Sequence, residues 1–85
     1  MPGTVYSQAL TDVVRELVKA RKASGLLQVE LAERIGKDQS FISNIERGQR
    51  RMDVLELYAI ARAMDRDPVD LYRELIANLP DYIEI

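Results

Sequence analysis

Cysteine, histidine and tryptophan are all absent from this chain of 85 residues. Without cysteine no disulfide can form, and without thiolates or imidazoles the usual ligands of a zinc site are missing. Catalysis by a Ser–His or Cys–His pair is excluded for the same reason. Carboxylates are present, but no pair of them stands out from ordinary surface charge. We therefore expect a protein that is not an enzyme and that requires no metal or other cofactor.

Long apolar runs are also missing. No stretch approaches the 18 consecutive apolar residues that suggest a membrane-spanning helix, and the start, MPGTVYSQ, lacks the basic and apolar segments of a secretory signal. A hydrophobic content of 47% beside 31% charged residues is typical of a folded domain. The sequence predicts one small soluble domain over residues 1–85, located in the cytoplasm and not bound to a membrane.

The chain has no overall excess of basic charge, since its formal net charge is -2. Residues 15–51 nevertheless carry nine Lys or Arg against five Asp or Glu, whereas residues 52–85 carry three against eight. This separation favours a basic surface that faces a polyanion and an acidic part that points elsewhere. The alternative is that both parts only keep the surface soluble.

Apolar residues recur at helical spacing along most of the chain, which predicts an all-α fold. We expect five helices, at about 8–24, Gln28–Ile35, Gln39–Arg47, 54–64 and from Pro68 until Pro80. Ser7 or Thr11 is expected to cap the first helix. The expected inner stripe of the fourth helix contains Val54, Leu57, Tyr58, Ala61 and Met64. Strand-like alternation occurs only in YIEI, at the C-terminal end.

Short polar residues and glycines mark the other helix boundaries. Asp38, Asp53 and Asp67 are each expected to cap the helix that follows, and Pro68 suits the first helical position. Gly36 follows the second helix, where a turn with a positive φ is expected.

The second and third helices are short and are separated by only a few residues. Such helices cross steeply, as in a helix-turn-helix. Ala32 is small where the two helices would approach most closely, and Gly36 supplies the turn. Ile42 and Ile45 are spaced to anchor the third helix from beneath. Together these four positions favour a helix-turn-helix at about 28–47.

The segment SGLLQVELAERIGKDQSFISNIERGQR resembles the helix-turn-helix of the lambda repressor/Cro family, also called the XRE family. The resemblance runs from about Leu17 to Leu71 and includes Gln28, the LA pair that follows it, the pattern IS.IE.G and AIARAM. It implies a compact five-helix domain that binds DNA, usually as a dimer. Leu27, Lys37 and the lack of a proline near Met52 depart from the family pattern.

A third helix placed in a major groove would present its exposed polar residues to base edges. The predicted base contacts are Gln39, Ser40, Ser43, Asn44 and Arg47. The predicted contacts to the DNA backbone are Gln28, Lys37, Gln49, Arg50 and Arg51, of which Gln28 is assigned by the resemblance. Phe41 lies between the two faces, so it belongs either to the core or against a thymine methyl group.

Two further sets of residues have expected roles. The resemblance implies that Arg21 and Glu46 form a partly buried ion pair of structural importance. The end of the chain leaves an apolar stripe that is expected to form a dimer interface. Its residues are Tyr72, Ile76, Leu79, Tyr82 and Ile83. The alternative is that this tail folds back on its own core.

These observations predict a sequence-specific transcriptional regulator. It would bind a pseudo-palindromic operator in double-stranded DNA as a homodimer, with the third helix in the major groove. The alternative is a protein-interaction module or an antitoxin-type subunit that uses the same fold, with the apolar tail against a different protein chain.

Overall fold

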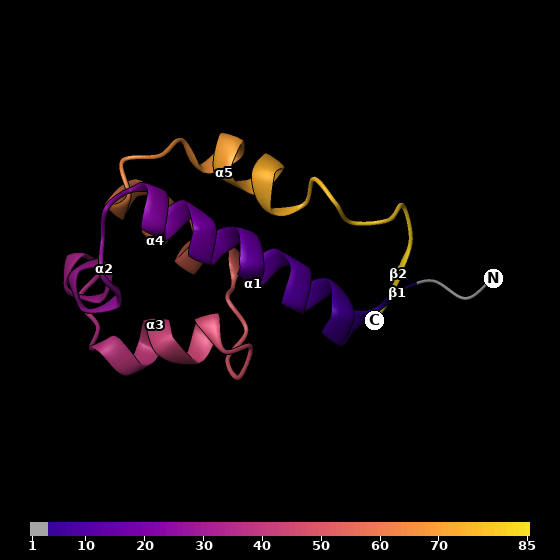
Figure 1. Ribbon diagram of the computed structural model, residues 1–85, viewed down its shortest axis with the longest axis horizontal. Coiled ribbons are helices and arrows are strands. Elements are labelled where there is room, and N and C mark those ends of the chain that lie inside the picture. The colour runs from indigo at the N-terminus through magenta and orange to yellow at the C-terminus, as the bar shows by residue number, and fades with distance from the viewer. Residues whose placement is uncertain (1–3) are drawn as a thin grey trace.

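Five helices follow one another along residues 4–85, which is the part of the chain that the structure, a computed structural model, describes (Figure 1). A short strand precedes them and another follows them. The elements are β1 (Thr4–Val5), α1 (Tyr6–Ala23), α2 (Gln28–Arg34), α3 (Gln39–Glu46), α4 (Val54–Ala63), α5 (Pro68–Leu75) and β2 (Ile83–Glu84). None of the helices among these residues is both long and apolar enough to cross a membrane.

The longest helix, α1, packs against α3 and α5. Figure 1 shows α1 across the middle of the molecule, with α3 along one side, α5 along the other and α4 behind it. The helix α2 stands at one end beside α3, and the two strands lie at the opposite end. The helix-turn-helix and the two strands are therefore at opposite ends of the domain.

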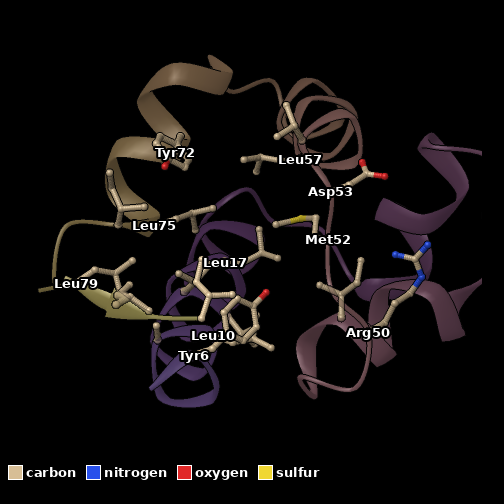
Figure 2. A pocket seen from close by; sticks show the side chains of 18 residues that line it. Tyr6, Leu10, Leu17, Arg50, Met52, Asp53, Leu57, Tyr72, Leu75 and Leu79 are labelled. Carbon is tan, nitrogen blue, oxygen red and sulfur yellow. The ribbon is translucent and has the colours of Figure 1, made fainter. Parts of the chain in front are cut away.

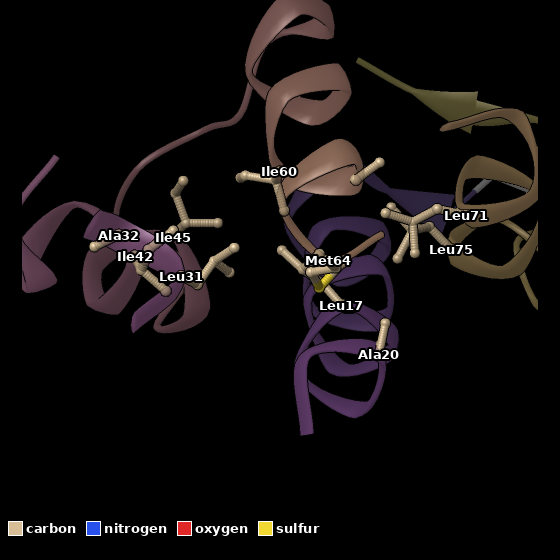
Figure 3. Packing of buried hydrophobic residues seen from close by; sticks show 11 residues of the cluster. Leu17, Ala20, Leu31, Ala32, Ile42, Ile45, Ile60, Met64, Leu71 and Leu75 are labelled. Carbon is tan, nitrogen blue, oxygen red and sulfur yellow. The ribbon is translucent and has the colours of Figure 1, made fainter. Parts of the chain in front are cut away.

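Every helix contributes to a single aliphatic core (Figure 3). Leu17 of α1, Leu31 of α2, Ile42 of α3, Ile60 of α4 and Leu71 of α5 are all buried. Complete burial of such a side chain stabilises the fold by about 1.5–3 kcal/mol. Because α2 and α3 share this core with the other three helices, the position of the helix-turn-helix depends on the whole domain.

The three expected aspartate caps are confirmed. Asp38 accepts a hydrogen bond from the amide of Phe41, Asp53 accepts one from the amide of Glu56, and Asp67 accepts two in the first turn of α5. The expected cap of α1 is wrong, because that helix begins at Tyr6 and Val5 precedes it in an extended conformation. The strand β1 holds Val5 there by pairing in parallel with β2, a long-range contact with no local signal.

The inner stripe of α4 differs from the expected one. Val54 and Tyr58 are exposed, whereas Ile60, which the periodicity did not select, is completely buried. Ala61 and Met64 are buried as expected. An apolar residue at the right spacing is buried only if another element covers it, and no element of the described chain covers Val54 or Tyr58. Apolar side chains of α4 are therefore left on the surface.

The last helix is shorter than expected, because α5 ends at Leu75 and not near Pro80. Beyond it the amides of Ala77 and Leu79 bond to carbonyl oxygens only three residues earlier, which tightens the chain into turns. The tail then continues away from the helix-turn-helix and turns at the end of the molecule where β1 lies, to form β2 (Figure 1). The strand-like alternation of YIEI is confirmed for Ile83 and Glu84.

Gly36 provides a test of the turn, because its φ is +73° and a Cβ atom there would meet no heavy atom within 4 Å. Substituting alanine should lower the free energy of unfolding by about 1–2 kcal/mol, because the left-handed conformation strains residues with a Cβ atom. Asparagine tolerates this conformation better, so Gly36→Asn should cost less. Urea unfolding of the three proteins measures both effects. An alanine variant as stable as the parent would contradict this assignment.

Candidate nucleic-acid interface

The crossing of α2 and α3 has the geometry that the sequence predicts. Ala32 is completely buried, Ile42 and Ile45 are each only 2% exposed, and Gly36 has a positive φ. The amide of Lys37 donates to the carbonyl oxygen of Ala32, which closes the end of α2 and redirects the chain into α3. The opposite side of α3 is thereby turned away from the core.

That outer side of α3 carries the residues predicted to contact bases. Gln39, Ser40 and Arg47 are exposed, and Ser43 and Asn44 are half-buried, so none lies beneath other parts of the described chain. Arg47 donates a hydrogen bond to the side-chain oxygen of Asn44. The α3 surface is thus polar and open along its length.

One residue of this set also has a local role at the start of α3. The Ser40 hydroxyl donates to a carboxylate oxygen of Asp38, the cap residue, over 2.6 Å. This bond, followed by that from the Phe41 amide, lowers the pKa of Asp38. Asp38 therefore stays ionised to a lower pH than an unperturbed aspartate, so the cap of α3 is kept over that range.

A buried ion pair lies behind α3. Arg21 of α1 donates two hydrogen bonds to the Glu46 carboxylate, over 2.6 and 3.0 Å, and a third to the carbonyl oxygen of Leu26 over 2.8 Å. The side chains of Arg21 and Glu46 are only 9% and 6% exposed. Because the guanidinium is bidentate, this pair fixes the C-terminal end of α3 against α1.

The same carboxylate is linked to the outer side of α3 through two glutamines. The amide nitrogen of Gln28 donates to Glu46 over 2.8 Å, and the amide nitrogen of Gln39 donates to the Gln28 oxygen over 3.2 Å. A carboxylate only accepts hydrogen bonds, so it dictates the orientation of the Gln28 amide. Gln39 then retains its oxygen and one N–H, the pair of groups that a bidentate contact with adenine needs.

The residues predicted to contact the DNA backbone lie around α3 but differ in their surroundings. Lys37 and Gln49 are exposed at its two ends, and Gln28 is half-buried at the start of α2. The Arg51 guanidinium lies 4.4 Å from the centre of the Tyr6 ring. These residues lie on segments next to the outer side of α3, where they suit an anionic backbone.

Arg50 is engaged more extensively, in contacts that the sequence analysis did not anticipate. Its guanidinium makes two hydrogen bonds to Glu56, over 2.9 and 2.8 Å, and lies 4.4 Å from the centre of the Phe41 ring. The ring is half-buried and packs against the core. The bond from Arg50, followed by that from the Asp53 amide, lowers the pKa of Glu56. In the sequence, only the separation of six residues between Arg50 and Glu56 could have suggested that the two side chains form a pair.

The residues predicted to form a dimer interface are divided between two surroundings. Ile76, Leu79 and Ile83 are half-buried and line an apolar cavity of about 320 Å³ between α1, α4, α5 and the tail (Figure 2). Tyr72 lines the same cavity although its side chain is exposed, whereas Tyr82 is exposed and does not line it. Other large apolar side chains are exposed in the first turns of α4 and α5, namely Val54, Leu55, Tyr58 and Val69.

The fold and this arrangement define a helix-turn-helix domain of the DNA-binding type. Two short helices cross at a glycine turn, the second presents a polar outer side, and cations lie at both of its ends. A family model described as helix-turn-helix matches residues 17–71.

Solved structures and curated proteins agree with this class. An XRE-family like protein from Pseudomonas syringae is 38% identical, with a TM-score of 0.76 and coverage of 86% of this chain and 89% of the other. The restriction-modification controller protein C.AhdI from Aeromonas hydrophila is 33% identical, with a TM-score of 0.71 and coverage of 78% and 96%. An uncharacterized HTH-type transcriptional regulator, y4dJ of Sinorhizobium fredii, is 38% identical over 53 residues, which are 62% of this chain and 69% of the relative. The chain belongs to the XRE family of helix-turn-helix proteins.

The buried ion pair can be tested by removing one or both of its charges. Arg21→Met leaves the Glu46 carboxylate buried without its cation, so the free energy of unfolding should fall by about 3–5 kcal/mol. The double variant Arg21→Met/Glu46→Leu has no buried charge at this place and should lie much closer to the parent in urea unfolding.

The matched control is Arg73→Met, which removes the cation of the exposed pair between Arg73 and Asp70. Its cost should stay below about 1 kcal/mol, because solvent screens exposed pairs. An Arg21 variant that loses no more stability than this control would contradict the role assigned to the buried pair.

Proposed function

We propose that the protein is a sequence-specific transcriptional regulator that places α3 in the major groove of its operator. The observation that carries this proposal is the chain of contacts from the buried Arg21–Glu46 pair through Gln28 to Gln39. A core interaction thereby orients an exposed amide at the start of α3. Such pre-orientation serves recognition of a base edge, because an amide held in place loses less entropy on binding. The relatives named as transcriptional regulators and as a controller protein support the same class.

The residues of the interface divide into two groups by what they can read. Gln39, Ser43 and Asn44 offer donors and acceptors on the outer side of α3, and these groups suit base edges in the major groove. Lys37 and Arg51 offer positive charge on the adjoining turn and loop, and this charge suits phosphates of any sequence. Since α4 and α5 belong to the acidic part of the chain, they would lie away from the DNA.

Substitutions in the two groups should have distinguishable effects on DNA binding. Gln39→Ala should relax base preference at one position of a site selected from a random DNA pool. Arg51→Gln should weaken binding to all sequences alike and reduce the slope of log affinity against log salt by about 0.9. Gel shifts at two salt concentrations, on the selected and scrambled sites, measure both effects.

The matched control is Arg73→Gln, which removes an exposed cation from α5 in the acidic part of the chain. It should change neither base preference nor the salt slope. A pool without any enriched sequence would sink the proposal, and an equal loss on every sequence from Gln39→Ala would remove Gln39 from the base-reading group.

The proposed assembly is a homodimer, because one short helix reads only a few base pairs and a two-fold protein matches a pseudo-palindromic operator. Part of the stripe predicted from the tail packs within its own chain, as Ile76, Leu79 and Ile83 do. We place the centre of the interface on the exposed apolar surface of the first turns of α4 and α5, here called the α4–α5 face. Its residues are Val54, Leu55, Tyr58, Val69 and Tyr72.

Leu55→Glu tests this assembly, since the Leu55 side chain is 78% exposed and an acidic residue is favourable in the first turn of a helix. The variant should fold normally but sediment as a monomer at concentrations where the parent is a dimer. Tyr82→Glu, which alters the exposed tail, should remain dimeric. Monomeric Tyr82→Glu beside dimeric Leu55→Glu would move the interface to the tail. A parent protein that is monomeric at high concentration would rule out the homodimer.

A further inference from the structure

Arg50 joins two helices whose relative orientation matters for reading a two-fold operator. It lies in the loop between α3 and α4, and its backbone amide donates to the carbonyl oxygen of Asn44 over 3.2 Å, near the end of α3. Its guanidinium covers Phe41, at the beginning of the same helix. A single residue therefore contacts both ends of α3.

The other contact of Arg50 is with the first turn of α4. The two guanidinium nitrogens that bond to Glu56 meet both carboxylate oxygens, which is the strongest geometry available to an arginine and a carboxylate. Glu56 is itself fixed, because one of its oxygens also accepts from the amide of Asp53 over 3.0 Å in the capping box of α4. Figure 2 shows the Arg50 guanidinium extending toward the start of α4, where Asp53 lies.

These contacts leave Arg50 poorly suited to act mainly as a phosphate ligand. Its planar donors face Glu56, and one of them also bonds to the carbonyl oxygen of Arg51 over 2.8 Å. A phosphate would have to compete with a carboxylate that is bound through two hydrogen bonds. The side chain is instead placed to hold α3, the intervening loop and α4 in one arrangement.

From these contacts we infer that Arg50 and Glu56 are positioning residues that set the half-site spacing which the protein accepts. The inference rests on the proposed function, because it requires α3 to read DNA and the α4–α5 face to join two copies. The first turn of α4 contributes Val54, Leu55 and Tyr58 to that face. The two copies of a dimer change alike. A change in the angle between α3 and α4 therefore displaces both copies of α3, and both displacements alter the distance between them.

The experiment measures how strictly the protein discriminates spacing, using the operator selected above and derivatives with one base pair inserted or deleted between its half-sites. Glu56→Gln breaks the charge pair, yet it keeps the capping box because glutamine also serves at this position. Arg50→Lys keeps the positive charge but cannot form the two parallel hydrogen bonds of a planar guanidinium. Each variant should reduce the affinity ratio between the selected and altered spacings by at least about threefold, an effect within the usual range of coupling between contacting residues.

Base preference within one half-site should stay unchanged in both variants, and the double variant should be no worse than either single one. The matched control is Glu33→Gln, which removes an exposed acidic charge from α2 and should leave the spacing preference as it is. Urea unfolding of each variant checks that loss of discrimination is not loss of fold.

Two outcomes would overturn the inference while the proposed function stands. Glu56→Gln could tighten binding equally at every spacing, which would make Glu56 only a negative charge that repels DNA. Arg50→Gln could lower the salt slope by about 0.9 without any effect on spacing, which would make Arg50 a phosphate contact. Failure of the parent protein to select any DNA would instead overturn the proposed function itself.

Discussion

The bidentate ion pair between Arg21 and Glu46 is the interaction on which the candidate interface depends. It lies between α1 and α3, where both side chains are nearly removed from solvent. A buried pair of this kind adds little net stability, but neither charge is tolerated alone. Its value here is geometric, because the Glu46 carboxylate also receives Gln28 and through it orients Gln39. The core and the candidate interface thus share one carboxylate.

A second charged pair acts on the other side of α3. Arg50 and Glu56 are more exposed than Arg21 and Glu46, so solvent screens them and their effect on stability is smaller. Their effect on orientation does not depend on burial, since two parallel hydrogen bonds define a direction as well as a distance. The helix α3 is consequently tied to α1 by one carboxylate and to α4 by another. A helix of only eight residues needs such ties, because a helix this short has little stability of its own.

Local chemistry explains why much of this fold could be predicted. The aspartate caps at Asp38, Asp53 and Asp67 and the turn at Gly36 depend on a few neighbouring residues, and each is confirmed. Two of the predictions that failed concern contacts between distant segments. The predicted cap of α1 was wrong because β1 pairs with β2, which lies almost eighty residues further along the chain. The predicted inner stripe of α4 was wrong because the spacing of apolar residues does not show which of them another element covers.

The sequence by itself determined the class of protein, the five helices and the polar outer side of α3, because helical spacing, caps and a glycine turn are encoded locally. Only the tertiary structure decided which partner each charged side chain takes. From the sequence, Arg50 was predicted to be one of several cations in a basic loop that contact the DNA backbone. The fold places it between Phe41 and Glu56. The same holds for Gln39, which the fold connects to a buried ion pair. Hydrogen-bond partners are chosen by distance and direction in space, and these exist only once all five helices have packed.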